Sequence, residues 1–520
     1  MKKRLVSLIL AACMVAGMCP AAMAGETEAA AESDAGNPYA GLDLSDYEEI
    51  EFYTVGTQGT DWQEVVDQVN DLMVKKINTK VNFHVIPFSD YVTKYQLFLA
   101  GDEDIDIIYG APWIGYSDYV KNGAYQSFDW DFVEKYMPQA AKLQAASSWD
   151  EVKVDGKYYS VPNNRSTIDG FGEATTQSLL DKYGYKAEDI NSYDKLIEYL
   201  DKVAADSAET GVYPINCQNN YPIDAFYWYV PRYHFFDMNA GAITWMVWKY
   251  DTGKPFSVDD LQWFASTPEY KDFCLQMADF YKKGYFPSSV MSNDTTLGDN
   301  IRAGISAVTD ASPGSIASIQ ADMPDDTVKF LNCCTDDKTQ VRRGNYLVYT
   351  ACFPANSKKM ERAAVALDVI KFDPEIHNLL IGGIEGKHYI LNKENNTYTP
   401  GPDADKYPWY SWAFLYQNDS DPSLELDPEL QEIQDQFKAK EAPADEFPVT
   451  GFIYDSSKYE AEISALTALM NEYRFSFNFG IYGDDTEAQL DSFISQCKDL
   501  GIDDIIADYR QQLSDYLANK

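Results

Sequence analysis

Strand and helix patterns alternate along the first part of the folded sequence. The expected elements are a strand at 51–55, a helix at 62–77, a strand at 81–86, a helix at 91–99 and a strand that begins at Ile105. Asp61 is a candidate N-cap for the first helix, whose apolar residues recur at helical spacing. Strands joined by helices in this way form a parallel sheet with right-handed crossovers. The alternation therefore predicts an α/β fold.

The third of these strands ends in a sharp turn that carries aromatic residues. The apolar run from Ile105 to Tyr109 is broken by Gly110, and Pro112 and Trp113 follow directly. Open α/β sheets bind ligands at the carboxyl ends of their strands. Trp113 and Tyr116 are therefore candidate ligand contacts, although packing of Trp113 in the core is an open alternative.

The chain is too long for one ordinary hydrophobic core, which favours two lobes over its 520 residues. Two extended segments, 161–165 and 344–353, are expected to cross between the lobes. The first follows a hairpin at 152–161 with Asp155-Gly156 at its turn. We expect lobe one at 47–161, lobe two at 162–300, a return to lobe one at 301–355 with a strand at 305–309, and the rest of lobe two at 356–520. Helices are expected at 179–183, 193–206, 258–264, 268–283, 357–371, 459–473 and 488–519.

The first 24 residues are typical of an export signal. Lys2, Lys3 and Arg4 precede an apolar run that is too short to span a bilayer comfortably. Ala22-Met23-Ala24 fits a cleavage site, which we favour. The alternative is a lipoprotein signal, because Leu10-Ala11-Ala12-Cys13 fits a lipobox and would place a lipid on Cys13. Both interpretations place the protein outside the cell membrane. The acidic segment 25–46 is expected to be a disordered tether.

The charge balance limits the classes of partner. Removing the signal leaves 39 basic against 82 acidic residues, a net charge of −43. This excludes nucleic acid and anionic membrane surfaces as natural partners. A neutral ligand is compatible with the charge.

Enzyme and metal motifs are missing from the sequence. We find neither GxSxG, HExxH, CxxC nor a complete Walker A motif, and acidic pairs are too numerous to nominate a glycosidase site. We therefore expect no catalysis, no metal and no cofactor. Six cysteines follow the signal segment: Cys217, Cys274, Cys333, Cys334, Cys352 and Cys497. Their spacing favours buried free thiols and leaves one bridge open, while the adjacency of Cys333 and Cys334 disfavours a bond between these two.

Aromatic residues concentrate in two further stretches, 221–236 and 407–416. Prolines interrupt both stretches, which favours loops, and polar residues such as Asn219, Asn220 and Asp224 accompany the first. Aromatic rings with amide or acid neighbours match the apolar and hydroxyl faces of a sugar. The alternative is that each stretch forms a buried helix.

In order along the chain, EFYTVG, IDIIYGAPW, KYYSVPNNRS and AGISAVTDASPGS resemble extracellular solute-binding proteins of bacterial ABC importers, of the sugar or lipoprotein type. The segment IGGIEGKHYILN with the helical tail resembles the C-terminal domain of unknown function in that group. The resemblance implies the two-lobed type II periplasmic-binding-protein fold, with an interlobe cleft and a hinge. It also implies a monomer that delivers its ligand to an ABC permease.

The resemblance nominates further contacts, which with the aromatic candidates make up the expected site. The expected ligand-binding residues are Trp113, Tyr116, Arg165, Trp228, Tyr229, Trp245, Asp310, Trp409 and Trp412. The expected ligand is an oligosaccharide. One alternative is a peptide or other nutrient whose carboxylate Arg165, Arg232 or the Arg342-Arg343 pair would bind. A secreted glycoside hydrolase or surface lectin is the second alternative.

Overall fold

The computed structural model describes residues 37–101, 103–154, 156–164, 168, 170–216, 225–238, 245–293, 297–321, 323, 325–344, 346–410, 413–414, 421–442, 449 and 452–519. The chain divides into two units, 1–42 and 43–520. In the described part of the first unit, the Tyr39 N–H donates to Asn37 Oδ1 over 3.0 Å. The elements below all belong to the second unit.

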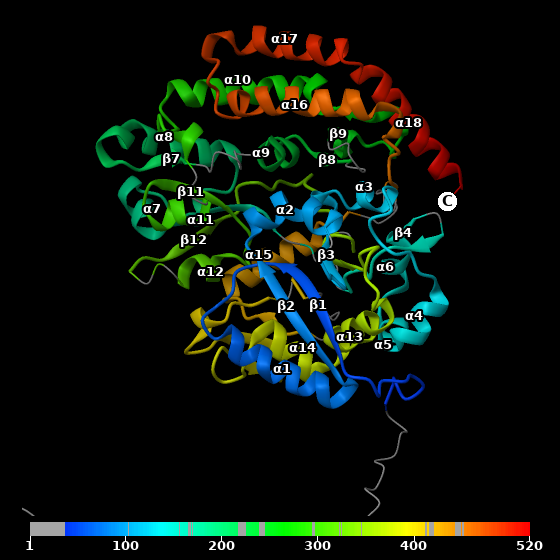
Figure 1. Ribbon diagram of the computed structural model, residues 1–520. Helices are drawn as coiled ribbons and strands as arrows, with labels where there is room; N and C mark the ends of the chain where they lie inside the picture. Colours follow the sequence, from blue (N-terminus) through cyan, green and yellow to red (C-terminus); the bar gives the residue numbers. More distant parts are fainter. Residues whose placement is uncertain are drawn as a thin grey trace, which may run out of the picture. The chain divides into compact units, whose positions relative to one another are not determined.

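The first sheet has the strand order β13-β3-β1-β2. Its strands are β1 (Glu48–Val55), β2 (Thr79–Ile86), β3 (Ile107–Gly110) and β13 (Thr350–Cys352). β1 pairs in parallel with β2 and with β3, whose labels mark them in Figure 1. β13 is antiparallel to β3. The helices α1 (Trp62–Ile77) and α2 (Phe88–Ala100) provide the two connections. The predicted alternation of strands and helices is therefore confirmed.

Asp61 does not cap α1 as the sequence predicts, because its side chain makes no hydrogen bond to the helix backbone. Its carboxylate instead lies 2.6 Å from Lys387 Nζ and 3.2 Å from His388 Nε2. Hydrogen bonds from these two side chains lower the pKa of Asp61 to about 2. Asp61 thus ties the start of α1 to a segment more than three hundred residues away.

The second sheet has the order β12-β6-β11-β7. It comprises β6 (Gly172–Thr176), β7 (Tyr213–Ile215), β11 (Ser306–Ala311) and β12 (Val328–Leu331). β11 is antiparallel to β6 and parallel to β7. The expectation that strand 305–309 returns to the first sheet is therefore wrong. Of the described strands between residues 301 and 355, only β13 belongs to the first sheet. The apolar pattern identifies a strand, but pairing partners are chosen by tertiary contacts that the pattern does not encode.

The remaining strands form small sheets. Their bounds are β4 (Lys153–Val154), β5 (Lys157–Tyr158), β8 (Phe235–Asp237), β9 (Met246–Lys249), β10 (Gln262–Trp263), β14 (Tyr389–Asn392), β15 (Thr397–Pro400) and β16 (Ser423–Leu424). β4 and β5 form the hairpin predicted around Gly156. The helix expected at 258–264 is replaced by short 3-10 turns around β10.

The helices cover both sheets. The other bounds are α3 (Tyr116–Lys121), α4 (Trp130–Tyr136), α5 (Pro138–Leu143), α6 (Ala146–Glu151), α7 (Gln177–Tyr183), α8 (Tyr193–Thr210), α9 (Ala225–Arg232), α10 (Pro268–Lys282), α11 (Leu297–Arg302), α12 (Ile316–Ala321), α13 (Met360–Phe372), α14 (Pro374–Gly382), α15 (Pro428–Ala439), α16 (Glu460–Asn478), α17 (Thr486–Asp499) and α18 (Ile502–Asn519).

α13 belongs with the first sheet, which corrects the expected assignment of residues 356–520 to lobe two. Every side chain from Arg362 to Phe372 is buried. Such a helix needs packing partners on all sides. Contacts with α1, α4, α5, α14 and β1 provide them.

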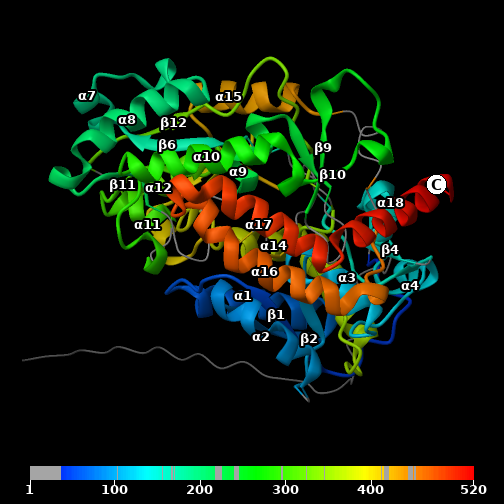
Figure 2. The same ribbon diagram turned by 90° about the horizontal axis from the view of Figure 1, so that it is seen from above.

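The C-terminal helices α16 and α17 pack against α10, and α18 packs against α17, as Figure 2 shows from above. The sequence predicts one helix over 488–519. The structure has two helices instead, because the helical path is interrupted between α17 and α18 at Gly501, whose φ is +90°. Glycine adopts this left-handed conformation without the steric cost that a Cβ would add. Among the described residues, no helix has the length and apolar character needed to cross a membrane.

Candidate functional site

The strand order of the first sheet reverses between β1 and β3. The connection through α1 leads from β1 to one side, and the connection through α2 leads back to the other side. Ligands of open α/β sheets bind at the carboxyl ends of the strands at such a point. Two segments begin there, Gly56–Thr57 after β1 and the 3-10 turn Pro112–Ile114 after β3. The turn contains Trp113, whose side chain lies outside the described part of the structure.

Buried tyrosines form a hydrogen-bonded cluster next to the turn after β3. Tyr116 is 1% exposed, its hydroxyl lies 3.1 Å from Ser160 Oγ, and its ring stacks on Tyr125. The Tyr95 hydroxyl lies 2.7 Å from the Tyr125 hydroxyl, and the Tyr91 hydroxyl donates to Tyr109 O over 2.7 Å. Burial raises the pKa of these hydroxyls well above the usual value, so they remain neutral hydrogen-bonding groups.

The two predicted crossing segments lie side by side. The Val161 N–H donates to Ala351 O over 2.8 Å, and the Ala351 N–H donates back to Val161 O over 3.1 Å. Asn163 N–H donates to Tyr346 O over 2.9 Å. Lys371 on α13 donates to Pro162 O over 2.6 Å. The two segments are therefore joined into one ribbon and anchored to a helix of the first lobe.

The Asn164 side chain is 2% exposed at the end of the first crossing segment. Its Oδ1 accepts the Ala145 N–H over 3.2 Å. Its Nδ2 has no hydrogen-bond partner in the described structure. A buried donor without a partner is costly unless a ligand or a water pairs with it.

One edge of the second sheet gathers polar groups. β7, β11 and β12 end there and β6 begins there, so that Asp310 lies opposite Glu173. Glu173 is 4% exposed, and burial raises the pKa of Asp310. Within the described residues, the buried Thr309 Oγ1 has no hydrogen-bond partner. The carboxylates at this edge can accept hydrogen bonds from a ligand, and the Thr309 hydroxyl can either donate or accept one.

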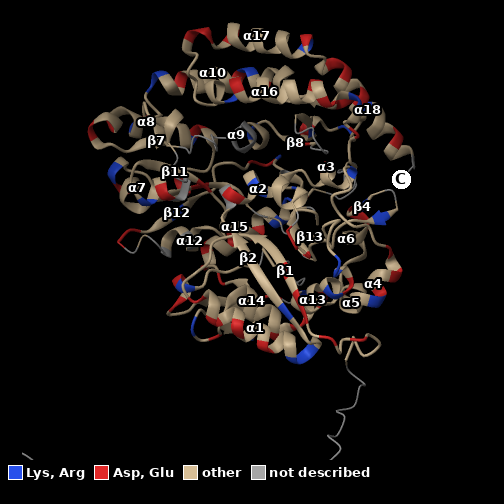
Figure 3. Cartoon of the chain, in the orientation of Figure 1, with Lys and Arg blue, Asp and Glu red and all other residues tan. Residues whose placement is uncertain are grey.

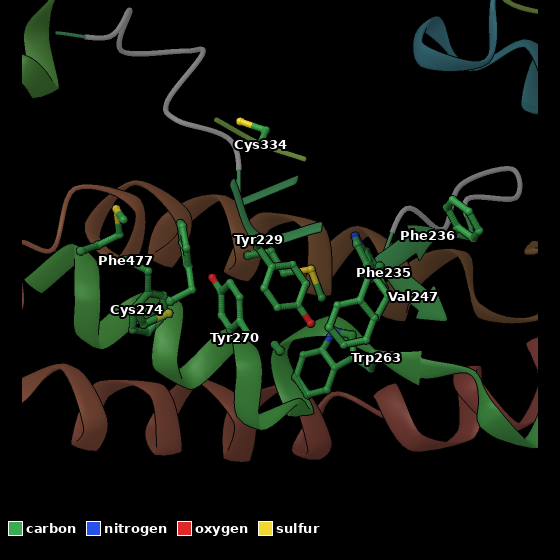
Figure 4. Close-up of a cluster of buried hydrophobic side chains, with 14 of the residues drawn as sticks. Tyr229, Phe235, Phe236, Val247, Trp263, Tyr270, Cys274, Cys334 and Phe477 are labelled. Atoms are coloured by element: carbon green, nitrogen blue, oxygen red, sulfur yellow. The ribbon is translucent and has the colours of Figure 1, made fainter. Parts of the chain in front are cut away.

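Two of the predicted site residues lie in the core. Tyr229 is 0% exposed, its hydroxyl lies 2.6 Å from Thr267 Oγ1, and its ring stacks on Phe235 (Figure 4). Trp245 is 7% exposed in the same hydrophobic cluster. In this structure neither side chain presents a surface to a ligand.

Trp409 is half-buried and packs within the first lobe. Its ring stacks on Tyr398 with centroids 3.7 Å apart and meets Tyr389 edge-on. Arg165, Trp412 and Cys13 lie outside the described residues, as does the Trp228 side chain on α9. Of the predicted side chains, the structure thus brings Tyr116 to the crossing segments and Asp310 to the edge of the second sheet.

Sequence reasoning missed several polar residues of this region: Asn164, Glu173, Thr309, Lys371 and Gln144, whose Oε1 accepts from Lys371 Nζ over 3.0 Å. Asn164 had a usable signal, because two amides follow directly after Pro162 in an extended segment. Lys371 had none, since a lysine near a helix end is usually exposed. In the described residues, no group of three or more His, Cys, Asp or Glu side chains is arranged to hold a metal ion.

Comparison with known families decides the class of the chain. Residues 67–372 match the model of the bacterial extracellular solute-binding proteins. The chain belongs to this family. Residues 448–518 of this solute-binding protein match a domain of unknown function, DUF3502.

A curated relative aligns with the solute-binding protein over nearly its whole length. A carbohydrate ABC transporter substrate-binding protein of Streptococcus pneumoniae is 23% identical over 508 residues, covering 93% of this chain and 94% of the relative.

Solved structures share the two-lobed fold. The N-glycan transport solute binding protein of Streptococcus pneumoniae in complex with Man1GlcNAc has a TM-score of 0.70 at 20% identity, covering 91% of this chain and 100% of that one. The alginate-binding protein AlgQ2 without calcium ion has a TM-score of 0.65 at 14% identity, covering 91% and 99%. The solute-binding protein therefore has an α/β fold of two lobes, as the sequence predicts.

Proposed function

We propose that this solute-binding protein captures an oligosaccharide between its two lobes and delivers it intact to an ABC permease. The observation that carries the proposal is the alignment, over 93% of this chain, with a carbohydrate ABC transporter substrate-binding protein. The proposal places the protein outside the cell membrane, as a monomer. It is either released after Ala24 or anchored by a lipid on Cys13.

The polar groups of the candidate site suit a neutral, hydroxyl-rich ligand. Asn164 Nδ2 offers a buried donor, Thr309 Oγ1 can donate or accept, and the Asp310 carboxylate accepts. Acidic side chains are spread along the helices, including α1, α17 and α18 (Figure 3). A neutral sugar meets no strong repulsion from such a surface, whereas a large anion would.

The peptide alternative needs an arginine that can bind a carboxylate. Arg343 already forms an ion pair with Glu441, with Nη2 2.9 Å from Oε2. Arg232 donates to Gln276 and lies over the rings of Tyr193 and Tyr233. Arg342 lies 4.0 Å from Asp237. For the three arginines of this alternative that the structure describes, these engagements favour a sugar over a peptide as the ligand, whereas Arg165 lies outside the described residues.

Thermal unfolding of residues 25–520 in the presence of separate oligosaccharides and short peptides tests the proposal. A ligand that binds only the native state stabilises it by RT ln(1 + [L]/Kd), so the melting temperature rises with the logarithm of the ligand concentration once this exceeds Kd. We expect one class of oligosaccharide to raise it, with Man1GlcNAc included in the panel. A rise with peptides alone would keep the receptor fold and reject the sugar.

A further inference from the structure

Two adjacent cysteines lie at the same edge of the second sheet as Glu173 and Asp310. Cys333 and Cys334 follow β12 in a loop, and the last residue of β12, Leu331, lies opposite Glu173. The two Sγ atoms are 3.7 Å apart. Cys333 is 1% exposed and Cys334 is 5% exposed. The pair therefore has thiols within reach of each other beside the candidate ligand site.

The two Sγ atoms lie within hydrogen-bond distance of each other, and either thiol can be the donor. The thiolate is the attacking species in thiol–disulfide exchange, and either cysteine of the pair can provide it.

The other described cysteines are placed differently. Cys274 and Cys352 are fully buried, and burial raises the pKa of both. Burial also raises the pKa of Cys497 to about 12. Among the described residues, none of these three thiols lies within hydrogen-bond distance of a second thiol, so none can close a bond of this kind. These three serve as internal controls for the reactivity of the pair.

We propose that Cys333 and Cys334 are a redox-modifiable pair, which closes to a disulfide between adjacent residues by exchange with an external disulfide. One cysteine of the pair loses its proton and its thiolate attacks one sulfur of the external disulfide, so that the first external sulfur leaves and takes up that proton as a thiol. The thiol of the other cysteine then attacks the sulfur of the first, the Cys333–Cys334 bond forms, and the second external sulfur leaves as a thiol with the second proton. Two cysteine thiols and one external disulfide thus become one protein disulfide and two small thiols.

The expected bond is a labile one. Adjacent Cα atoms are about 3.8 Å apart, closer than the usual separation across a disulfide. A constrained disulfide is more easily reduced, which suits a reversible modification better than a structural bridge. The pair lies in a loop, so opening the site to a reagent separates no strands of the sheet.

Peptide mass mapping tests the pair directly, because trypsin releases Phe330–Lys338 with both cysteines and no others. Residues 25–520 are refolded in mixtures of reduced and oxidised glutathione, alkylated under denaturing conditions and digested. We expect this peptide to become about 2 Da lighter and resistant to alkylation, the loss of two hydrogens, and to recover both alkylation sites after reduction.

The variants C333S and C334S provide matched controls, because each leaves a single thiol that cannot form the bond. The peptides containing Cys274, Cys352 and Cys497 should remain fully alkylated throughout. Alkylation of both thiols of the pair at every glutathione ratio would overturn the proposal. So would a pair found only as glutathione adducts or linked to another peptide. The readout needs no ligand, so it is independent of the proposed transport function.

Discussion

Val161 and Ala351 exchange two backbone hydrogen bonds, of 2.8 and 3.1 Å, and thereby join the two segments that run between the lobes. Segments that cross separately could bend independently, whereas a paired ribbon bends as one. Hinges in two-lobed proteins are a few residues that absorb the change in φ and ψ on closure. Because Ala351 also pairs with Tyr109 of β3, the ribbon around Val161 and Ala351 is held to the first sheet, and the expected hinge lies where the two segments leave this ribbon toward the second sheet.

Replacing Lys371 by Met should change how stability depends on pH. Burial lowers the pKa of Lys371 from 10.5 to about 7 in the folded protein. Between these values the unfolded chain holds a proton that the folded chain lacks, so this lysine makes the free energy of unfolding rise with pH. The wild-type minus Lys371→Met difference should therefore rise from pH 7 upward, by at most about 1.4 kcal/mol per pH unit.

Urea unfolding at several pH values between 7 and 9 measures this difference. The matched control is Lys94→Met, because Lys94 is half exposed on α2 and pairs only with Asp90 in the ion pairs of the described structure. Its difference from wild type should not vary with pH over this range. Equal slopes for wild type and Lys371→Met would contradict the assignment of a depressed pKa to Lys371.

Replacing Lys121 by Met should loosen the contact between the first lobe and the C-terminal domain. Lys121 on α3 donates to Tyr454 O over 2.6 Å and lies 3.4 Å from Asp455. Tyr454 is 0% exposed and its hydroxyl donates to Asp508 on α18, so the acceptor is held firmly. The variant should populate wider separations of the two lobes in the absence of ligand.

Pulsed electron paramagnetic resonance can measure the separation between spin labels at Leu97 on α2 and Tyr281 on α10, which are 68% and 46% exposed. A broader distribution shifted to longer distances is expected for Lys121→Met. Lys121→Arg should retain the wild-type distribution, because a guanidinium can donate to the same carbonyl. A distribution identical to wild type for Lys121→Met would show that this contact does not hold the lobes.

Replacing Tyr229 by Phe should reduce stability without changing ligand affinity. The change removes the hydrogen bond between the buried hydroxyl and Thr267, which is worth about 1 kcal/mol. Thr267 keeps its bonds to Phe264 O and Tyr270 N–H, so no further group loses its partner. Urea unfolding and sugar titration of the same preparation separate the two effects. A loss of affinity at unchanged stability would place Tyr229 in the ligand site.

Replacing Trp113 by Ala should weaken ligand binding by about tenfold or more, since one stacked ring contributes roughly 1.4 kcal/mol or more to affinity. The basis is the position of the turn Pro112–Ile114 at the carboxyl end of β3, where the strand order reverses. Titration calorimetry with the sugar that raises the melting temperature measures the effect. Unchanged affinity would remove Trp113 from the site.

The sequence predicted local elements well and their assembly less well. The bounds of α1 match the expected helix at both ends, because its apolar residues have a clear helical period. The partner of β11 could not be predicted, because a strand pattern does not specify which sheet receives it. The lobe of α13 was missed for a similar reason, since a helix buried on every side matches either core equally well.

In the candidate site too, local features could be predicted from the sequence, whereas contacts between distant segments could not. The turn after β3 and the first crossing segment could be predicted from breaks in apolar runs at Gly110 and Pro162. The pairing of Val161 with Ala351 could not, because it joins residues that are far apart in the sequence. Aromatic density also misled the site prediction at Tyr229, since the composition of a stretch does not distinguish a core from a binding surface.

Titration calorimetry of residues 25–520 with an oligosaccharide, followed by recovery and mass analysis of the sugar, tests most directly whether the protein is a sugar carrier. We expect one bound sugar per chain, a Kd in the micromolar range or tighter, and a sugar recovered unchanged. No binding to any oligosaccharide, with binding to a peptide instead, would contradict the proposed ligand class. Recovery of cleaved sugar would contradict the role of a carrier.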